Sequence, residues 1–186
     1  MEFTLYYRGP LKANRGAKEK HTIRKHFHQQ LKVLWNQKPL NAFRDKLHDP
    51  LHKDQTINVL REIPPFRFAP LVAERVSLIA ELNITMLRPE PPGSIVTQGG
   101  DIDNRLKTLL DALKVPSSPG ALPRQEVPGP DEDPFYCLLE DDSLITRISV
   151  NTDRLLEVGL APSEAVILVH VVTKQIEVYM GTIGLA

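Results

Sequence analysis

Cysteine is nearly absent from this chain, because Cys137 is the single one in 186 residues. One cysteine excludes a disulfide within the chain and a zinc site built from several cysteines. We therefore expect a reducing compartment, with the cytoplasm as the default location, and a structural role for Cys137. The six histidines show no metal-site spacing, and we interpret His21, His26 and His28 as part of a basic helical face.

Long apolar runs are also missing. No stretch approaches the roughly 18 apolar residues of a membrane span, and the opening residues MEFTLYYRGP lack the charged and apolar regions of a signal peptide. We therefore expect no membrane partner. Apolar residues make up 41% of the chain and charged residues 25%, as in globular proteins. A chain of this length buries about 70% of its unfolded surface, which predicts one domain over residues 1–186.

Net charge is zero, but the charges are unevenly distributed. Residues 1–50 hold eleven Lys and Arg against four Asp and Glu, whereas residues 51–186 hold twelve against nineteen. The basic part could face phosphates while an acidic site lies elsewhere, or the two parts could pair with each other. Charge alone leaves both interpretations open.

Apolar periodicity predicts an α/β (α+β) fold with a mixed β-sheet covered by helices. Spacings of three and four predict helices from about Lys18 to Gln37 and from about Asn104 to Leu113. Residues 38–70 stay unassigned, apart from a short helix near Leu40 to Leu47. Alternating or β-prone runs predict strands at about residues 2–8, 75–87, 143–153, 164–172 and 176–180.

Proline is abundant, with 16 residues, and six of these lie between Val115 and Pro134 together with two glycines. Such a segment cannot continue a helix or a central strand. We therefore expect an irregular and mobile insertion at about residues 115–136.

The stretch DIDNRLKTLLDAL, residues 101–113, combines charged groups with an apolar helical face. If Asp103 caps a helix that begins at Asn104, Asp101 still lies in the extended entry, and the two carboxylates can converge on one cation. Asn104, Lys107 and Asp111 then follow at i, i+3 and i+7, opposite the leucines.

A second acidic group, LLEDDSLI, places Asp141 and Asp142 just before a β-prone run. Carboxylate oxygens suit Mg²⁺ or Mn²⁺, so aspartates from the two segments could hold one ion. A simpler interpretation stays open for each residue. Asp103 and Lys107 could form a surface ion pair, Asp111 could be solvated, and Asp141 and Asp142 could be turn residues.

The pattern D-x-D-N-x-x-K-x-x-x-D-A-L, followed downstream by D-D and a β-prone run, resembles the RusA-type family of Holliday junction resolvases. The likeness covers about residues 101–150, interrupted by the proline-rich insertion. By this resemblance Asp101, Asp103 and Asp142 correspond to the essential metal-binding carboxylates, and Lys107 corresponds to the catalytic lysine. Asn104, Asp111 and Asp141 are supporting candidates beside them.

The resemblance implies a Mg²⁺-dependent endonuclease, with Mn²⁺ as an alternative ion, that acts as a homodimer on branched DNA in recombination and repair. Basic residues of the first part would then contact DNA phosphates: Arg15, Lys18, Lys20, Arg24 and Lys25. Two alternatives remain open, a nucleic-acid-binding protein of the same fold that does not cut, and a non-enzymatic protein whose basic part docks an acidic partner.

Overall fold

The computed structural model describes residues 1–13, 15–49, 57–90, 102–178 and 181–185. These residues form two β-sheets, three α-helices and several short 3₁₀ turns within one domain. The expected mixture of helices and strands is therefore confirmed. None of the described helices is long and apolar enough to cross a bilayer.

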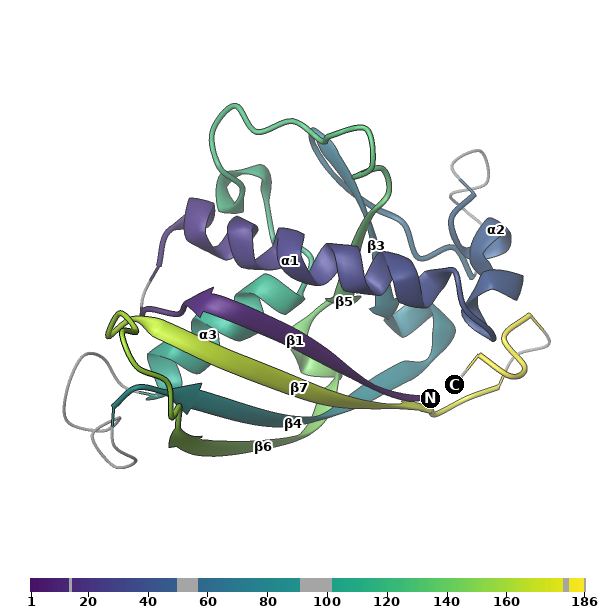
Figure 1. The fold of residues 1–186 in the computed structure, drawn as a ribbon. Helices are drawn as coiled ribbons and strands as arrows, with labels where there is room; N and C mark the ends of the chain where they lie inside the picture. The colour runs from purple at the N-terminus through teal and green to yellow at the C-terminus, as the bar shows by residue number, and fades with distance from the viewer. Residues whose placement is uncertain (14, 50–56, 91–101, 179–180, 186) are drawn as a thin grey trace.

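The larger sheet contains the four strongest predicted strands, in the order β1-β7-β4-β6 (Figure 1). Its strands are β1 (Glu2–Pro10), β4 (Leu78–Arg88), β6 (Ile145–Arg154) and β7 (Glu164–Gln175). β7 pairs antiparallel with both β1 and β4, and β6 pairs parallel with β4. The sheet is therefore mixed, and β1 and β6 are its two edges.

The smaller sheet was not predicted. Its strands, in the order β2-β3-β5, are β2 (Arg61–Ile63), β3 (Phe66–Val72) and β5 (Phe135–Leu139). All five residues of β5 are buried. A strand buried on both faces shows no polar alternation, so its sequence FYCLL carries no period of two to recognise.

Two longer helices pack on the sheets, α1 (Ala17–Trp35) and α3 (Ile102–Leu113). The apolar residues predicted for the inner face of α1 are buried, including Ile23, Phe27 and Leu31. The short helix expected near residue 40 is a 3₁₀ turn (Leu40–Ala42) followed by α2 (Arg44–Leu47). Three further 3₁₀ turns are Glu74–Val76, Pro119–Ala121 and Asp142–Leu144.

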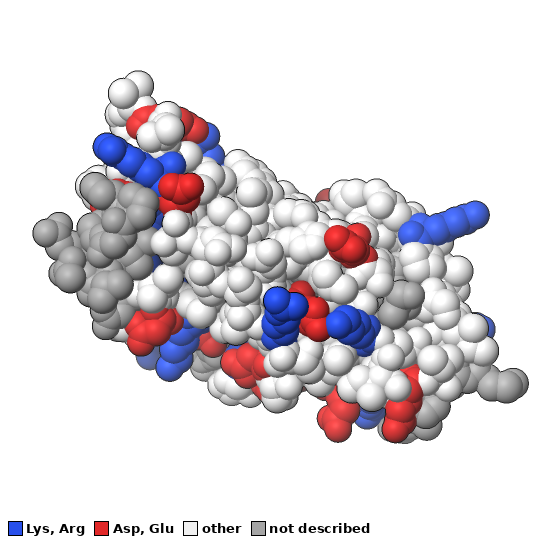
Figure 2. Space-filling view, turned by 90° about the horizontal axis from the view of Figure 1, so that it is seen from below, with Lys and Arg blue, Asp and Glu red and all other residues white. Residues whose placement is uncertain are grey.

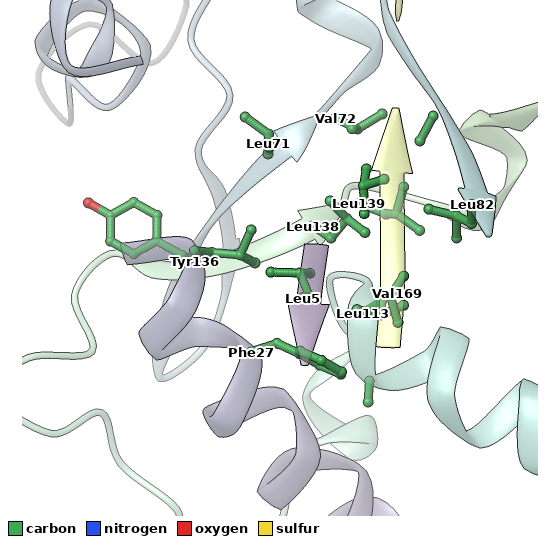
Figure 3. Close-up of a cluster of buried hydrophobic side chains, with 14 of the residues drawn as sticks. Leu5, Phe27, Leu71, Val72, Leu82, Leu113, Tyr136, Leu138, Leu139 and Val169 are labelled. Carbon is green, nitrogen blue, oxygen red and sulfur yellow. The ribbon is translucent and has the colours of Figure 1, made fainter. Parts of the chain in front are cut away.

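The main core lies between the helices and the two sheets (Figure 3). Leu5 and Val169 come from the larger sheet, Leu138 from the smaller one, and Phe27 and Leu113 from the two helices. Burial of apolar side chains from every layer in one cluster explains why the elements form a single unit.

The proline-rich segment is held by specific contacts rather than extending freely from the domain. Val115 and Leu122 are buried in a second apolar cluster with Phe66 and Phe135. Ion pairs join Glu126 and Asp131 of this segment to Lys25 and Lys32 of α1. Local sequence patterns do not predict these contacts, because they join residues about 100 positions apart.

Two strand boundaries also differ from expectation. Residues 176–178 are not in a strand, so the expected last strand is wrong there, and its remaining residues 179 and 180 lie outside the described chain. β4 begins at Leu78 rather than near residue 75, because Ser77 adopts a left-handed backbone with a φ of 52°. That conformation ends a 3₁₀ turn and cannot be part of a strand.

Candidate functional site

The start of α3 carries the first part of the motif. α3 begins at Ile102, two residues before the predicted position, so Asp103 lies in its first turn instead of capping it. A carboxylate there is stabilised by the positive end of the helix dipole. Asp101 lies outside the described residues, and its expected convergence with Asp103 stays a prediction.

Asp103 and Lys107 are both exposed and lie one helical turn apart on the same face. They form no ion pair with each other, which argues against the simpler interpretation of these two residues. Among the described residues, neither side chain has a hydrogen-bond or ion-pair partner. The first two turns of α3 therefore present one carboxylate and one ammonium group to solvent.

Buried polar residues fix the start of α3 from beneath. Arg105 is buried, and its Nη1 donates to the carbonyl oxygen of Leu11 at 2.6 Å. Burial lowers the pKa of Arg105, and the charge of Arg88 at the end of β4 lowers it further. Thr108 donates its hydroxyl to the carbonyl of the half-buried Asn104 at 3.0 Å. Arg105 thus ties the start of α3 to Leu11, the residue after β1.

The last turn of α3 is tied to α1. Asp111 accepts a hydrogen bond from Lys20 at 2.7 Å in an ion pair whose side chains are about a quarter exposed. The guanidinium of Arg24 donates to the carbonyl oxygens of Asp111 and Lys114. Asp111 therefore connects two helices, and it is neither freely solvated nor placed beside Asp103.

The downstream acidic pair is also held by contacts within the chain. Lys114 donates to Asp142 at 2.7 Å and lies 4.0 Å from Asp141. Asp141 accepts from the backbone N–H of Ser143, and this hydrogen bond lowers the pKa of Asp141. Asp141 is thus the cap of a 3₁₀ turn, as the turn interpretation predicted.

Asp103 lies in the first turn of α3, whereas Asp142 contacts Lys114, the residue just after the other end of this helix. Lys114, the partner of Asp142, lies eleven positions after Asp103, which corresponds to about 16 Å along a helix. The strand register agrees, because Ile145, three residues after Asp142, pairs with Ala80 at the start of β4, whereas α3 begins near its end. Two ligands of one ion lie within about 5 Å of each other. The predicted joint use of Asp103 and Asp142 by one ion within a chain is therefore corrected.

The described residues at the start of α3 offer a cation one carboxylate, that of Asp103. Among the described residues, no three His, Cys, Asp or Glu side chains are close enough to hold a metal. Mg²⁺ commonly takes only one or two protein carboxylates, and water and substrate phosphate complete its shell. The free carboxylate of Asp103 fits that role, and Lys114 removes Asp142 from it.

The predicted phosphate-binding residues are largely engaged inside the molecule. Arg24 is only 3% exposed and serves α3, so its assignment to DNA binding is wrong. Lys20 pairs with Asp111, and Lys25 pairs with Glu126 and Glu132. These pairs show that basic residues of the first part neutralise acidic residues of the second.

Lys18 is exposed and its ammonium group forms no hydrogen bond or salt bridge among the described residues, and Arg15 lies 3.9 Å from Glu19. Figure 2 shows the underside of the molecule with blue and red side chains interspersed among white ones. This face carries no continuous basic surface. Of the five predicted phosphate contacts, Arg15 and Lys18 remain available.

Two histidines expected on a basic face are buried. Burial lowers the pKa of His21 to about 4 and also lowers the pKa of His28. Nδ1 of His28 accepts from the backbone N–H of Tyr136, which leaves Nε2 to donate to the carbonyl oxygen of Asp131. A neutral ring satisfies both bonds. His28 therefore joins α1 to the proline-rich segment and to β5.

Sequence reasoning missed the role of Lys114. Lys114 follows the motif directly, and its position three residues after Asp111 was the only available signal that it belongs to the same helix end. Cys137 is buried, and burial raises the pKa of its thiol to about 12, in agreement with a structural role.

Comparisons with protein-family models, curated proteins and solved structures find no match for this chain.

Proposed function

We propose that this chain is a Mg²⁺-dependent endonuclease that hydrolyses phosphodiester bonds in branched DNA during recombination and repair. Asp103 would bind the ion, together with Asp101 if its side chain converges, and Lys107 would act on the scissile phosphate. Two symmetric cuts in a four-armed junction would suit a homodimer. The buried Cys137 accords with a reducing cytoplasmic location.

The observation that supports this function best is the unpaired state of Asp103 and Lys107. An ordinary surface helix gains stability when opposite charges four residues apart pair with each other. The chain forms such a contact elsewhere, between Arg15 and Glu19. Among the described residues, Asp103 and Lys107 have no partner, whereas Asp111 of the same helix pairs with Lys20 and Arg105 donates to the carbonyl oxygen of Leu11.

The chemistry divides between these two side chains. When bound, Mg²⁺ lowers the pKa of a water molecule and neutralises phosphate charge. Asp103 holds the cation at the start of α3. Lys107, one turn further along, donates to a non-bridging phosphate oxygen and stabilises the charge that develops as the leaving oxygen departs. Arg15 and Lys18 contribute contacts to the DNA backbone that carry no sequence information.

A cleavage assay tests this function. Wild-type protein with Mg²⁺ or Mn²⁺ is expected to cut a four-way junction faster than a flap or a linear duplex. Asp103→Asn and Lys107→Ala should lose cleavage while keeping most DNA binding. Asp45→Asn and Lys46→Ala are matched controls, because both residues are exposed on α2, away from α3.

The second candidate function is a binding protein of the same fold that does not cut DNA. It becomes the better account if the wild type binds the junction but leaves all three substrates intact with either metal. If DNA binding shows no decrease with added salt, phosphate contacts are absent. The chain would then be a protein-interaction domain.

A further inference from the structure

The two edge strands of the larger sheet, β1 and β6, differ in whether their outer backbone groups have partners among the described residues. Along β1, the side-chain amide of Gln30 from α1 accepts from the backbone N–H of Tyr6 at 2.9 Å and donates to the Tyr6 carbonyl at 2.6 Å. This contact occupies the outer edge of β1. β6 has ten residues, and the described chain offers no strand beyond it. An open edge of this length is a template for pairing with another strand.

The side chains of β6 alternate between the two faces of the sheet. Arg147 and Ser149 lie beside Glu81 and Asn83 of β4, on the face away from the helices. Asn151 and Asp153 continue the same row because side chains in a strand alternate with a period of two. From one end to the other, the row is thus basic, polar, polar and acidic.

We propose that β6 pairs antiparallel with β6 of a second copy of this chain, with a two-fold axis at Val150. In this register Arg147 lies opposite the partner's Asp153, and Ser149 lies opposite the partner's Asn151. The two-fold axis repeats both contacts. The row is therefore complementary to itself when reversed, as an interface between identical subunits requires.

Other registers lose this match. A two-fold axis perpendicular to the sheet keeps the helix side of both subunits on one face of the joined sheet. The two β6 strands can therefore shift only by steps that change each residue's partner by two positions, because the row from Arg147 to Asp153 must stay opposite the same row of the partner. The neighbouring registers place Arg147 opposite the partner's Asn151, or move Asp153 opposite the partner's Ser149. Only pairing about Val150 brings the opposite charges together.

Exposure on β6 agrees with an interface. Arg147 and Asp153 are exposed, and neither forms a salt bridge among the described residues. On the helix side, Ile148 is 42% exposed, which is high for an isoleucine in a long strand, and the partner's Thr152 would cover it. β6 lies along the underside of Figure 1, the side displayed in Figure 2.

The pairing would produce one sheet of eight strands with the helices of both subunits on the same side. It would also end at two copies. The outer strand at each end is β1, whose edge is closed at Tyr6 by Gln30, and this contact opposes the addition of a third subunit in the same way. This interface does not depend on the proposed nuclease activity.

Charge reversal tests the register. Sedimentation of the wild type at micromolar concentration should give about twice the 21.0 kDa mass of one chain. Arg147→Asp or Asp153→Arg alone puts like charges opposite each other twice, which should weaken the dimer on the order of tenfold or more. The double variant Arg147→Asp/Asp153→Arg restores both pairs and should recover most of the affinity.

Recovery in the double variant separates the interface from a folding defect, because two surface changes that each damaged folding would not repair one another. A wild type that stays monomeric at about 100 micromolar, a concentration high enough to populate a weak dimer, would overturn the proposal. So would a double variant that is weaker than either single variant.

Cross-linking gives an independent test, because Cys137 is buried and is the single native cysteine. In the proposed register Val150 lies opposite itself, within about 5.5 Å between Cβ atoms. Val150→Cys should therefore form a disulfide-linked dimer on mild oxidation. Leu168→Cys, on the inner strand β7, is the matched control and should stay monomeric on a denaturing gel. Equal cross-linking of the two variants contradicts the register.

Discussion

The first and last turns of α3 differ in what their charged residues do. At the start of α3, Asp103 in the first turn and Lys107 in the second face solvent without partners among the described residues. At the other end, Asp111 in the last turn binds Lys20, and Lys114, the residue after the helix, binds Asp142. One continuous sequence motif therefore contains two kinds of carboxylate, and the difference lies in which neighbours the fold supplies.

The contrast shows how an acidic motif can be divided between chemistry and structure. A carboxylate already paired with an ammonium group must break that pair before it binds a cation. Asp103 has no such pair to break. Matched substitutions at the two ends of the helix should therefore have different effects.

The largest effect is expected for the two aspartates. Asp103→Asn removes a charged ligand with almost no change in shape, and it should reduce cleavage on the order of 10³-fold or more. Asp142→Asn should reduce it less than about tenfold, because Asp142 pairs with Lys114 at the other end. Single-turnover cleavage of a four-way junction measures both. Equal losses would show that Asp142 takes part in the chemistry.

The two lysines provide the same comparison for positive charge. Lys107→Ala should lower the cleavage rate about 10²-fold, the loss expected when a donor to the transition state is removed. Lys114→Ala should leave the rate within about threefold, because its ammonium group serves Asp142. The rates are compared at saturating DNA, so that a change in binding does not enter. A similar loss in both variants would erase the distinction between the two ends.

Lowering the pH should destabilise the part of the fold in which α1 packs on the last turn of α3. The pKa of His21 falls from its ordinary value of 6.5 to about 4 in the folded chain, because the ring is buried and lies beside Arg24. The unfolded chain therefore binds more protons between these values. Stability from the neutral ring is complete above pH 6.5 and lost as the pH falls to about 4.

We expect His21 to contribute on the order of 2 kcal/mol to this pH dependence of the unfolding free energy. His21→Phe should flatten the profile between pH 7 and pH 4.5, because an aromatic ring replaces the titrating one between Phe66 and Phe135. Denaturant unfolding at several pH values measures it. An unchanged slope would mean that His21 is not the titrating group.

The smallest effect concerns the pair between Lys20 and Asp111. Asp111→Asn removes the charge but keeps the side-chain shape, and it should lower the unfolding free energy by about 1 kcal/mol. Asp103→Asn should change it by less than Asp111→Asn does, since it removes only the interaction of an exposed carboxylate with the helix dipole and no ion pair among the described residues. The two variants thus reverse their order between the stability assay and the cleavage assay. The same order in both would contradict the division of roles.

Local patterns were enough to find the elements with one polar and one apolar face. α1, α3 and the strands of the larger sheet all show a clear period in residues such as Ile23, Phe27 and Leu109. β5 escaped because every side chain in it is buried. The contacts of the proline-rich segment escaped because Lys25 and Glu126 meet only after folding.

The candidate site was predicted in part for the same reason. The sequence placed Asp103 and Lys107 on one helical face, which follows from their spacing alone. It could not reveal that Lys114 holds Asp142 at the far end of α3, or that Arg24 is buried under the helix. Both facts depend on tertiary packing, which residue spacing does not encode.

The most direct test of the central claim is metal binding at the start of α3. Calorimetric titration with Mn²⁺, without DNA, compares the wild type with Asp103→Asn and Asp142→Asn. The wild type and Asp142→Asn should bind the ion with affinities within about threefold of each other, whereas Asp103→Asn should lose most of the binding. If Asp142→Asn loses the ion and Asp103→Asn keeps it, the cation site does not lie at the first turn of α3.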